Sequence, residues 1–194
     1  MEEQANVPVF KGALIYGLIV GAISIVIALI FYFIGQSLET WAGIASMVIF
    51  FLLIIGSLIM FRKEYGNGYA TYGQLVFLSF IVGLVAAILS SLFTFGLYSM
   101  DEGYLQDTKY AAVERVDKQL DKMSARYQER FSDEQYEMVE ERMKEQRKKG
   151  IDKIEERSAL GLAMSGLFGA VILSVIIGLI AAIFIRKNPD PTQQ

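Results

Sequence analysis

Four long stretches of this sequence contain no charged residue, and no other feature constrains the fold as strongly. The stretches cover residues 12–38, 40–61, 65–100 and 158–185. A bilayer core about 30 Å thick is crossed by roughly 20 apolar residues in an α-helix, whereas the strands of a membrane barrel are about half as long and alternate in polarity. The sequence therefore predicts an all-α integral membrane protein with four transmembrane helices.

We predict that these helices span residues 10–34, 41–61, 72–97 and 160–186, within a single membrane domain over residues 1–194. The first span is expected to be retained, because its apolar run is too long for the core of a cleavable signal peptide. The lipid bilayer is thus the first partner that the sequence implies.

Residues 101–157, between the third and fourth spans, have the opposite composition. Of these 57 residues, 29 are charged. Burying even two of them at mid-bilayer would cost about 5 kcal/mol or more, so this insert must stay in water. Apolar residues recur in it at steps of three, four or seven, which indicates two amphipathic helices. We expect a long antiparallel helical hairpin outside the bilayer.

Each helix of the predicted hairpin has an apolar stripe. The stripes consist of Tyr110, Val113, Leu120, Met123, Tyr127 and Phe131 in the first helix and of Tyr136, Val139, Met143, Ile151 and Ile154 in the second. Three surfaces could cover a stripe: the other stripe, a second copy of the hairpin, or another protein. The candidate interaction residues are Tyr127, Phe131, Tyr136 and Met143.

Local patterns support these helices. Ser132 with Gln135 has the spacing of a capping box, and Phe131 with Tyr136 that of a hydrophobic staple, at the start of the second insert helix. Three acid–base pairs at a spacing of four residues are expected on the solvent side, where this order stabilises a helix. The pairs are Glu114 with Lys118, Glu140 with Lys144, and Glu145 with Lys149.

The short loop over residues 64–69 precedes the third span. Gly66 and Gly68 favour a plain turn, and a phosphate cradle is the alternative, disfavoured because no P-loop lysine follows. Thr71 with Gln74 then has the spacing of a capping box that would start the third span.

Charges near the span ends predict the topology. Lys11, Arg62, Lys63, Arg186 and Lys187 flank one side, whereas the turn over residues 35–40 holds one acid and no base. The positive-inside rule then places both termini in the cytoplasm and the hairpin in the periplasm. Basic residues between positions 147 and 157 oppose this assignment. They lie in a loop of about 60 residues, the length at which loop charges cease to influence the orientation of the spans.

Small residues recur every four positions in the spans, which allows helices to approach closely in lipid. The candidate packing residues are Gly17 and Gly21 in the first span, Gly83 in the third, and Gly161, Ser165 and Gly169 in the fourth. We expect packing within the chain, with homodimerisation through one of these faces as the alternative.

No residue pattern points to catalysis. The chain has no cysteine and no histidine, which removes thiol chemistry and the commonest general base and metal ligand. Ser165 lacks a general base in any span and is interpreted as a packing residue. We therefore expect no enzyme, no catalytic residue, no cofactor and no metal site, and the net charge of −3 shows no nucleic-acid footprint.

Three segments carry a resemblance to a known family. They are the block from Phe61-Arg62-Lys63-Glu64 through Gly66-Asn67-Gly68-Tyr69 to Thr71-Tyr72-Gly73-Gln74, the closing Gly178-Leu179-Ile180-Ala181-Ala182 with Arg186-Lys187-Asn188-Pro189, and the opening Lys11-Gly12-Ala13. Together they resemble a family of small bacterial membrane proteins, common in Bacteroidota and named domain of unknown function 4199. The resemblance implies a multi-pass protein of the bacterial inner membrane with no established activity, and it supplies no site residues.

The first functional hypothesis is a non-enzymatic structural or interaction protein. It would present the hairpin to a second copy or to a membrane or periplasmic partner. The alternative is a small transporter or channel subunit, because four glycine-rich spans could assemble around a pathway.

Overall fold

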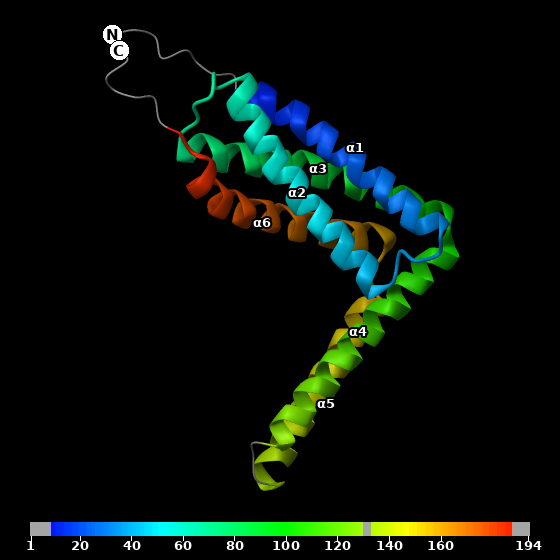
Figure 1. The fold of residues 1–194 in the computed structure, drawn as a ribbon. Helices are drawn as coiled ribbons and strands as arrows, with labels where there is room; N and C mark the ends of the chain where they lie inside the picture. The colour runs from blue at the N-terminus through cyan, green and yellow to red at the C-terminus, as the bar shows by residue number, and fades with distance from the viewer. Residues whose placement is uncertain (1–8, 130–132, 188–194) are drawn as a thin grey trace. The chain divides into compact units, whose positions relative to one another are not determined.

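The structure, a computed structural model, describes residues 9–129 and 133–187, without the side chains of residues 133–137. This part of the chain is all-helical and contains six α-helices (Figure 1). They are α1 (Val9–Phe33), α2 (Thr40–Glu64), α3 (Tyr72–Met100), α4 (Glu102–Gln128), α5 (Asp133–Glu155) and α6 (Ala159–Ile185). The ends of α1, α2, α3 and α6 lie within three residues of the predicted span ends.

Four of these helices, α1, α2, α3 and α6, are long enough and apolar enough to cross a membrane. The two helices between α3 and α6 are the predicted amphipathic pair, and their bounds fall inside the charged insert. The structure thus confirms the helical class and the number of candidate spans.

The chain divides into two compact units. Unit 1 combines residues 1–94 with residues 163–194, and unit 2 is Phe95–Leu162. Unit 1 therefore contains α1, α2 and most of α3 and α6, and unit 2 contains the hairpin of α4 and α5.

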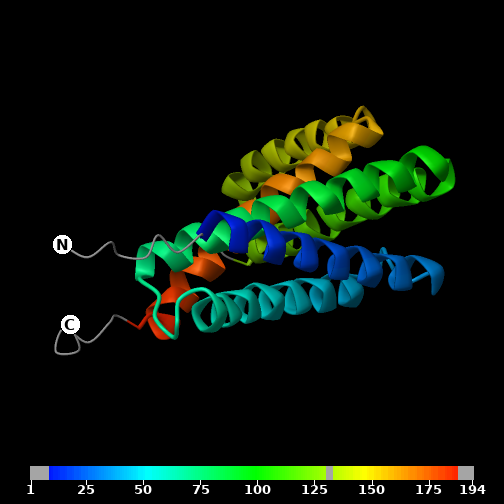
Figure 2. The same cartoon turned by 90° about the horizontal axis from the view of Figure 1, so that it is seen from above.

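The core of unit 1 is made of side chains from all four of its helices. Those of Ile54, Leu58 and Phe61 come from α2, those of Leu75, Leu78 and Val82 from α3, those of Ala13, Tyr16 and Val20 from α1, and those of Ile177, Ala181 and Ala182 from α6. Figure 2 shows α1 and α2 running side by side. Many large apolar side chains on the outer faces stay exposed, including Phe33, Leu52, Ile172 and Phe184.

One end of unit 1 is closed by the loop between α2 and α3. The amides of Tyr65 and Gly66 donate to the Phe61 carbonyl at 2.9 and 3.2 Å, and the Gly68 amide donates to the Arg62 carbonyl at 2.9 Å. These contacts satisfy carbonyls that the end of α2 would leave without partners. The glycine amides are thus used within a turn, as predicted, and are not open to a phosphate.

Hydrogen bonds from the same loop hold the end of α6 beside the start of α3. Ala70 and Lys187 exchange two backbone hydrogen bonds of 3.0 and 3.1 Å, so the chain after α6 pairs with the loop. Thr71 and Gln74 form the predicted capping box: the Thr71 amide donates to Gln74 Oε1 at 2.9 Å, and the Gln74 amide donates to Thr71 Oγ1 at 3.3 Å. Consequently α1 and α3 begin at the end of unit 1 where α2 and α6 finish (Figure 1).

Candidate functional site

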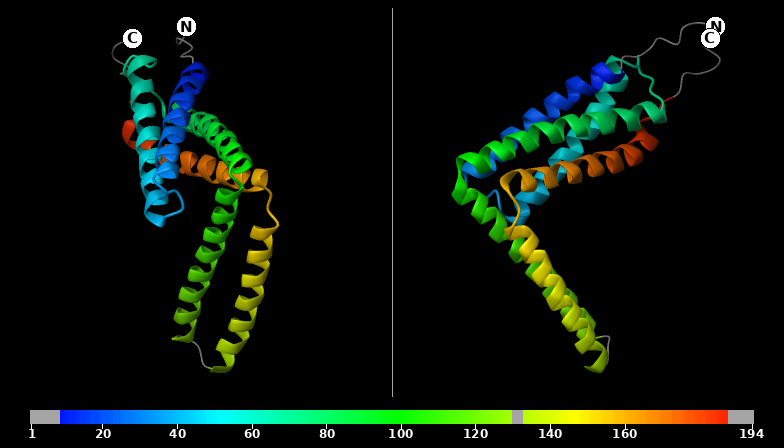
Figure 3. Two further views of the ribbon diagram at one scale, coloured as in Figure 1. Left: turned by 90° about the vertical axis from the view of Figure 1, so that its right-hand side faces the viewer. Right: turned by 180° about the vertical axis from the view of Figure 1, so that it is seen from behind.

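The helical hairpin of unit 2 is the candidate functional site. Its two helices run antiparallel and side by side, as both panels of Figure 3 show. Lys109 Nζ of α4 donates to the Glu155 carbonyl of α5 at 2.8 Å. Further along, a Cβ built on Gly150 would lie 3.7 Å from Cγ1 of Val116. These two contacts lie between α4 and α5, so the two helices of the hairpin pack against each other.

The start of α4 is fixed by a local cap. The Asp101 side chain accepts a hydrogen bond of 2.9 Å from the Tyr104 amide. This contact satisfies one of the amides that open the first turn, and the acid is favoured near the positive end of the helix dipole. The predicted capping box and hydrophobic staple at the hairpin tip involve Ser132 and Phe131, which lie outside the described residues.

Arg147 of α5 links the two helices by charge. Its Nε lies 3.1 Å from Oδ1 of Asp117, and its Nη2 pairs with Oδ1 of Asp121, one turn further along α4. Asp117 Oδ1 is fully buried and accepts no aligned hydrogen bond, so its contact with Arg147 is a charge–charge contact. Because the acids lie four residues apart, one guanidinium reaches both and so links α5 to two successive turns of α4.

Three further ion pairs lie along single helices, as the sequence predicted. Glu114 with Lys118, Glu140 with Lys144, and Glu145 with Lys149 are separated by 2.6, 2.8 and 2.6 Å. All are solvent-exposed pairs, so water screens them and each contributes only weakly to helix stability. The Lys149 ammonium donates to Glu145 and holds the pKa of that carboxyl below its ordinary value of 4.5.

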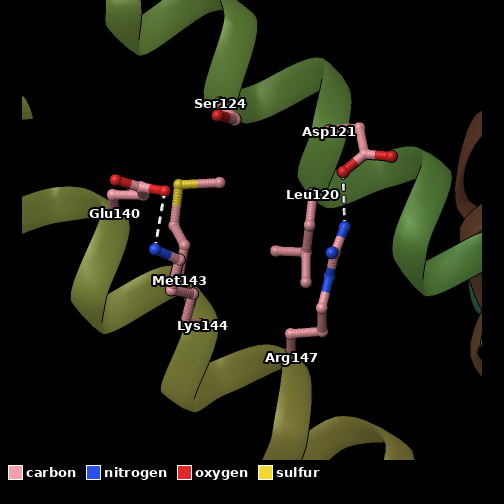
Figure 4. A pocket seen from close by; sticks show the side chains of 7 residues that line it. All are labelled: Leu120, Asp121, Ser124, Glu140, Met143, Lys144 and Arg147. Carbon is pink, nitrogen blue, oxygen red and sulfur yellow. Dashed lines mark hydrogen bonds and ion pairs between the residues drawn. The ribbon is translucent and has the colours of Figure 1, made fainter.

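A shallow pocket of about 140 Å³ opens beside the Arg147 contact. It is lined by Leu120, Asp121, Ser124, Glu140, Met143, Lys144 and Arg147. Figure 4 shows Leu120 and Met143 pointing into the space between the helices, with the ion pairs Asp121–Arg147 and Glu140–Lys144 on either side. The pocket thus has an apolar floor and a charged rim whose ionic groups already pair with one another.

The hairpin leaves much of its apolar surface open. Met143, at 9% exposure, is buried, whereas α4 contains no buried residue at all. Tyr110 is 76% exposed and Met138 is 62% exposed. Two helices alone can cover only one side of each stripe, so part of the apolar surface in unit 2 has no cover within the unit.

The four candidate interaction residues have different positions. Met143 is buried between the two helices, and Tyr127 is half-buried near the end of α4. Tyr136 belongs to α5, but its side chain is outside the described part of the structure, as is the whole of Phe131. Within the described hairpin, the large apolar side chains that are most exposed are Tyr110 and Met138, and only Tyr110 belonged to a predicted stripe.

The candidate packing residues of the apolar helices fall into two groups. A Cβ at Gly17 would lie 2.6 Å from Cβ of Val85, and a Cβ at Gly21 would lie 2.7 Å from Cδ1 of Leu89, so α1 and α3 approach closely at both glycines. By contrast, a Cβ at Gly161 would contact only Ser158 and Arg157, which directly precede α6. A Cβ at Gly169 would have no atom within 4 Å. Ser165 is exposed.

The closest approach in unit 1 joins α3 and α6. Ser174 lies directly on Gly83, and Ser79 lies directly on Gly178, so two serine–glycine pairs interlock in antiparallel order. Both serines are fully buried, and each hydroxyl donates at 2.8 Å to a carbonyl three residues earlier, that of Val76 or Val171. Sequence reasoning missed both serines, although their spacing of four from a glycine was the available signal.

A third contact extends this helix pair. Ser91 Oγ donates to the Ala163 carbonyl at 3.1 Å. One face of α3 therefore packs along α6 within unit 1, and this face contains Ser79, Gly83 and Ser91.

No group of three or more histidine, cysteine, aspartate or glutamate side chains that could hold a metal ion occurs among the described residues.

The fold and site define a class: an all-helical protein with four candidate membrane-spanning helices and a charged helical hairpin inserted before the last of them. The family described as "Protein of unknown function (DUF4199)" matches residues 15–187, most of the chain, and the chain therefore belongs to this family. The resemblance seen in the sequence is confirmed. No curated protein and no solved structure matches the chain.

Proposed function

We propose that this protein is a non-enzymatic, multi-pass protein of the bacterial cytoplasmic membrane that works through contacts made by its hairpin. The four apolar helices cross the bilayer, the termini are cytoplasmic, and the hairpin is in the periplasm. The family match and the four span-like helices support the membrane location, and the bases at the ends of the spans support the orientation.

The observation that carries the proposal is the incomplete burial of the hairpin. The helix α4 has an apolar stripe but no buried side chain, and Tyr110 and Met138 lie mostly exposed. Tyr110 near the start of α4 and Met138 near the start of α5 are two separate exposed apolar positions, and each is open to contact by another protein. Arg147 of α5 contacts Asp117 and Asp121 of α4, which joins the two helices that carry these positions.

Site-specific photocrosslinking in living cells tests the proposal. A photoreactive residue placed at Tyr110 or at Met138 is expected to give a discrete crosslinked band, either of twice the chain mass or with a second protein. The same residue placed at Lys118, whose side chain is 70% exposed and forms only a surface ion pair, is the matched control and should give none. If all three positions behave alike, the hairpin presents no specific surface.

The orientation is tested in the same cells with single cysteines, which is straightforward because the natural sequence contains none. A membrane-impermeant thiol reagent should label Lys122→Cys in the hairpin of intact cells and should label Lys63→Cys at the end of α2 only after lysis. The reverse pattern would place the hairpin in the cytoplasm.

A further inference from the structure

The end of unit 1 that gathers the helix termini is strongly basic. Its described residues 9–12, 61–72 and 185–187 contain five bases, namely Lys11, Arg62, Lys63, Arg186 and Lys187. They contain one acid, Glu64, which accepts a hydrogen bond of 2.6 Å from the Tyr16 hydroxyl. The described part of this end therefore has a surplus of four positive charges.

The fold itself brings these charges together. Arg62 Nη1 donates to the Ile185 carbonyl at 2.7 Å, which ties the end of α2 to the end of α6. The Ala70–Lys187 pairing holds the chain beyond α6 against the loop, and Gly12 of α1 packs on the Phe61 ring, 2.9 Å from an added Cβ. Bases from three helix ends thus share one small surface.

Arg62 has hydrogen-bonding capacity that the described chain does not use. A guanidinium carries five N–H donors, yet Nε of Arg62 is buried without an acceptor. The residue is only half-buried as a whole, so part of its side chain is open to the outside. Phosphate oxygens are strong acceptors for a guanidinium. Because Nε is buried and Nη1 donates to Ile185, a phosphate would approach the exposed part of the Arg62 side chain.

The surroundings of the bases favour an amphiphile over a free anion. The outer face of α6 just before Arg186 is apolar and open, with Ile180, Ile183 and Phe184 all exposed. Tyr69 lies beneath the Lys187 ammonium, 5.5 Å from it, and aromatic rings of this kind are enriched at the headgroup level of membranes. A ligand that joins a phosphate to acyl chains would contact both surfaces at once.

We propose that this basic end of unit 1 binds the headgroup phosphate of an anionic phospholipid, with Arg62 as its anchor and Lys63, Arg186 and Lys187 around it. The inference rests on the membrane location proposed above. Basic residues at a membrane surface attract anionic lipids, and each base contributes on the order of a fivefold change in affinity.

The test measures the melting temperature of the purified full-length protein in neutral detergent during titration with dioctanoyl phosphatidylglycerol. This lipid should raise the melting temperature in a saturable manner, and added salt should weaken the effect. Dioctanoyl phosphatidylcholine and inorganic phosphate are the comparison ligands, and both should act much more weakly. Equal stabilisation by phosphatidylcholine would reduce the effect to acyl-chain binding, and equal stabilisation by phosphate would assign it to a free anion; either result overturns the proposal.

The variants locate the site. The double substitution Lys63→Gln with Arg186→Gln removes two exposed bases and should weaken the apparent affinity for phosphatidylglycerol on the order of twentyfold to thirtyfold. Its charge-matched control is Lys118→Gln with Lys149→Gln in the hairpin, which should bind like the natural protein. Arg62→Lys keeps the charge but loses the planar pair of donors, and it should also bind more weakly. Unchanged affinity in both Lys63→Gln/Arg186→Gln and Arg62→Lys would overturn the proposal.

A separate measurement distinguishes this failure from failure of the membrane location. Alkaline extraction of cell membranes should leave the natural chain and the Lys63→Gln/Arg186→Gln variant in the pellet. Retention together with unchanged lipid affinity rejects the headgroup site alone. Release of the natural chain rejects the membrane location, and the headgroup proposal with it.

Discussion

Ser174 of α6 packs onto Gly83 of α3 so closely that its Cβ and Oγ atoms leave no room for a Cβ atom at Gly83. The Ser174 hydroxyl donates to the Val171 carbonyl of its own helix, so the contact buries a polar group whose hydrogen bond is already made. In lipid, close packing replaces the hydrophobic effect as the force between helices. Substitutions at this pair therefore test how strongly the packing of α3 against α6 stabilises unit 1.

Substituting Gly83→Ala should destabilise unit 1. The new methyl group would overlap Ser174, whose Cβ cannot rotate away, so the helices must separate at a cost of about 1–3 kcal/mol. Equilibrium unfolding of the protein in detergent measures the loss. Adding Ser174→Gly should recover much of it, because this second change removes the clashing atoms.

Gly169→Ala is the matched control for Gly83→Ala, since nothing lies within 4 Å of a Cβ at Gly169. Its free energy of unfolding should stay the same or rise slightly, because alanine favours helix over glycine. Equal effects of the two substitutions would contradict the interlocked packing of α3 and α6.

Substituting Arg147→Gln should loosen the hairpin. It removes contacts with Asp117 and Asp121, and because the Arg147 and Asp117 side chains are both 40% exposed, we expect a loss of about 0.5–1 kcal/mol. Amide hydrogen exchange in α5 reports the local opening free energy. A double-mutant cycle with Asp117→Asn isolates the pair, and a coupling energy of zero would show that the Arg147–Asp117 contact does not stabilise the hairpin.

Substituting Gly150→Ala should stabilise the hairpin by about 0.5–1 kcal/mol. Gly150 lies inside α5, and its added Cβ would meet Cγ1 of Val116 at 3.7 Å, an ordinary contact. Slower amide exchange in α5 is the expected readout. Faster exchange would show that α5 needs the freedom of glycine at this position.

The Glu145 carboxyl should titrate below its ordinary pKa of 4.5, because the ammonium of Lys149 favours its charged form. A lowered pKa in the folded state means that the pair stabilises the hairpin at pH values above 4.5 and that this contribution is lost as pH falls through the lowered pKa. Carboxyl NMR of the selectively labelled protein measures the titration. Lys149→Gln should raise the pKa toward 4.5, and an unchanged pKa would rule out the pair as its cause.

Patterns within single helices were predictable from the sequence. The predicted spans match α1, α2, α3 and α6 to within three residues at each end, because the length and apolar composition of a span can be read directly from the sequence. The spacing of four between Glu114 and Lys118 and the spacing of three between Thr71 and Gln74 each gave a correct contact. Such contacts need only the regular geometry of one helix or one helix start.

Contacts between helices needed the tertiary structure. Gly17 and Gly169 look alike in the sequence, yet one touches Val85 and the other faces open space. A spacing of four residues defines a face of a helix but does not say which helix covers it. Helix alignment decides which residues meet, and it is a property of the folded chain. It determines that Ser174 meets Gly83, that Arg147 meets two acids, and that Arg62 meets the Ile185 carbonyl.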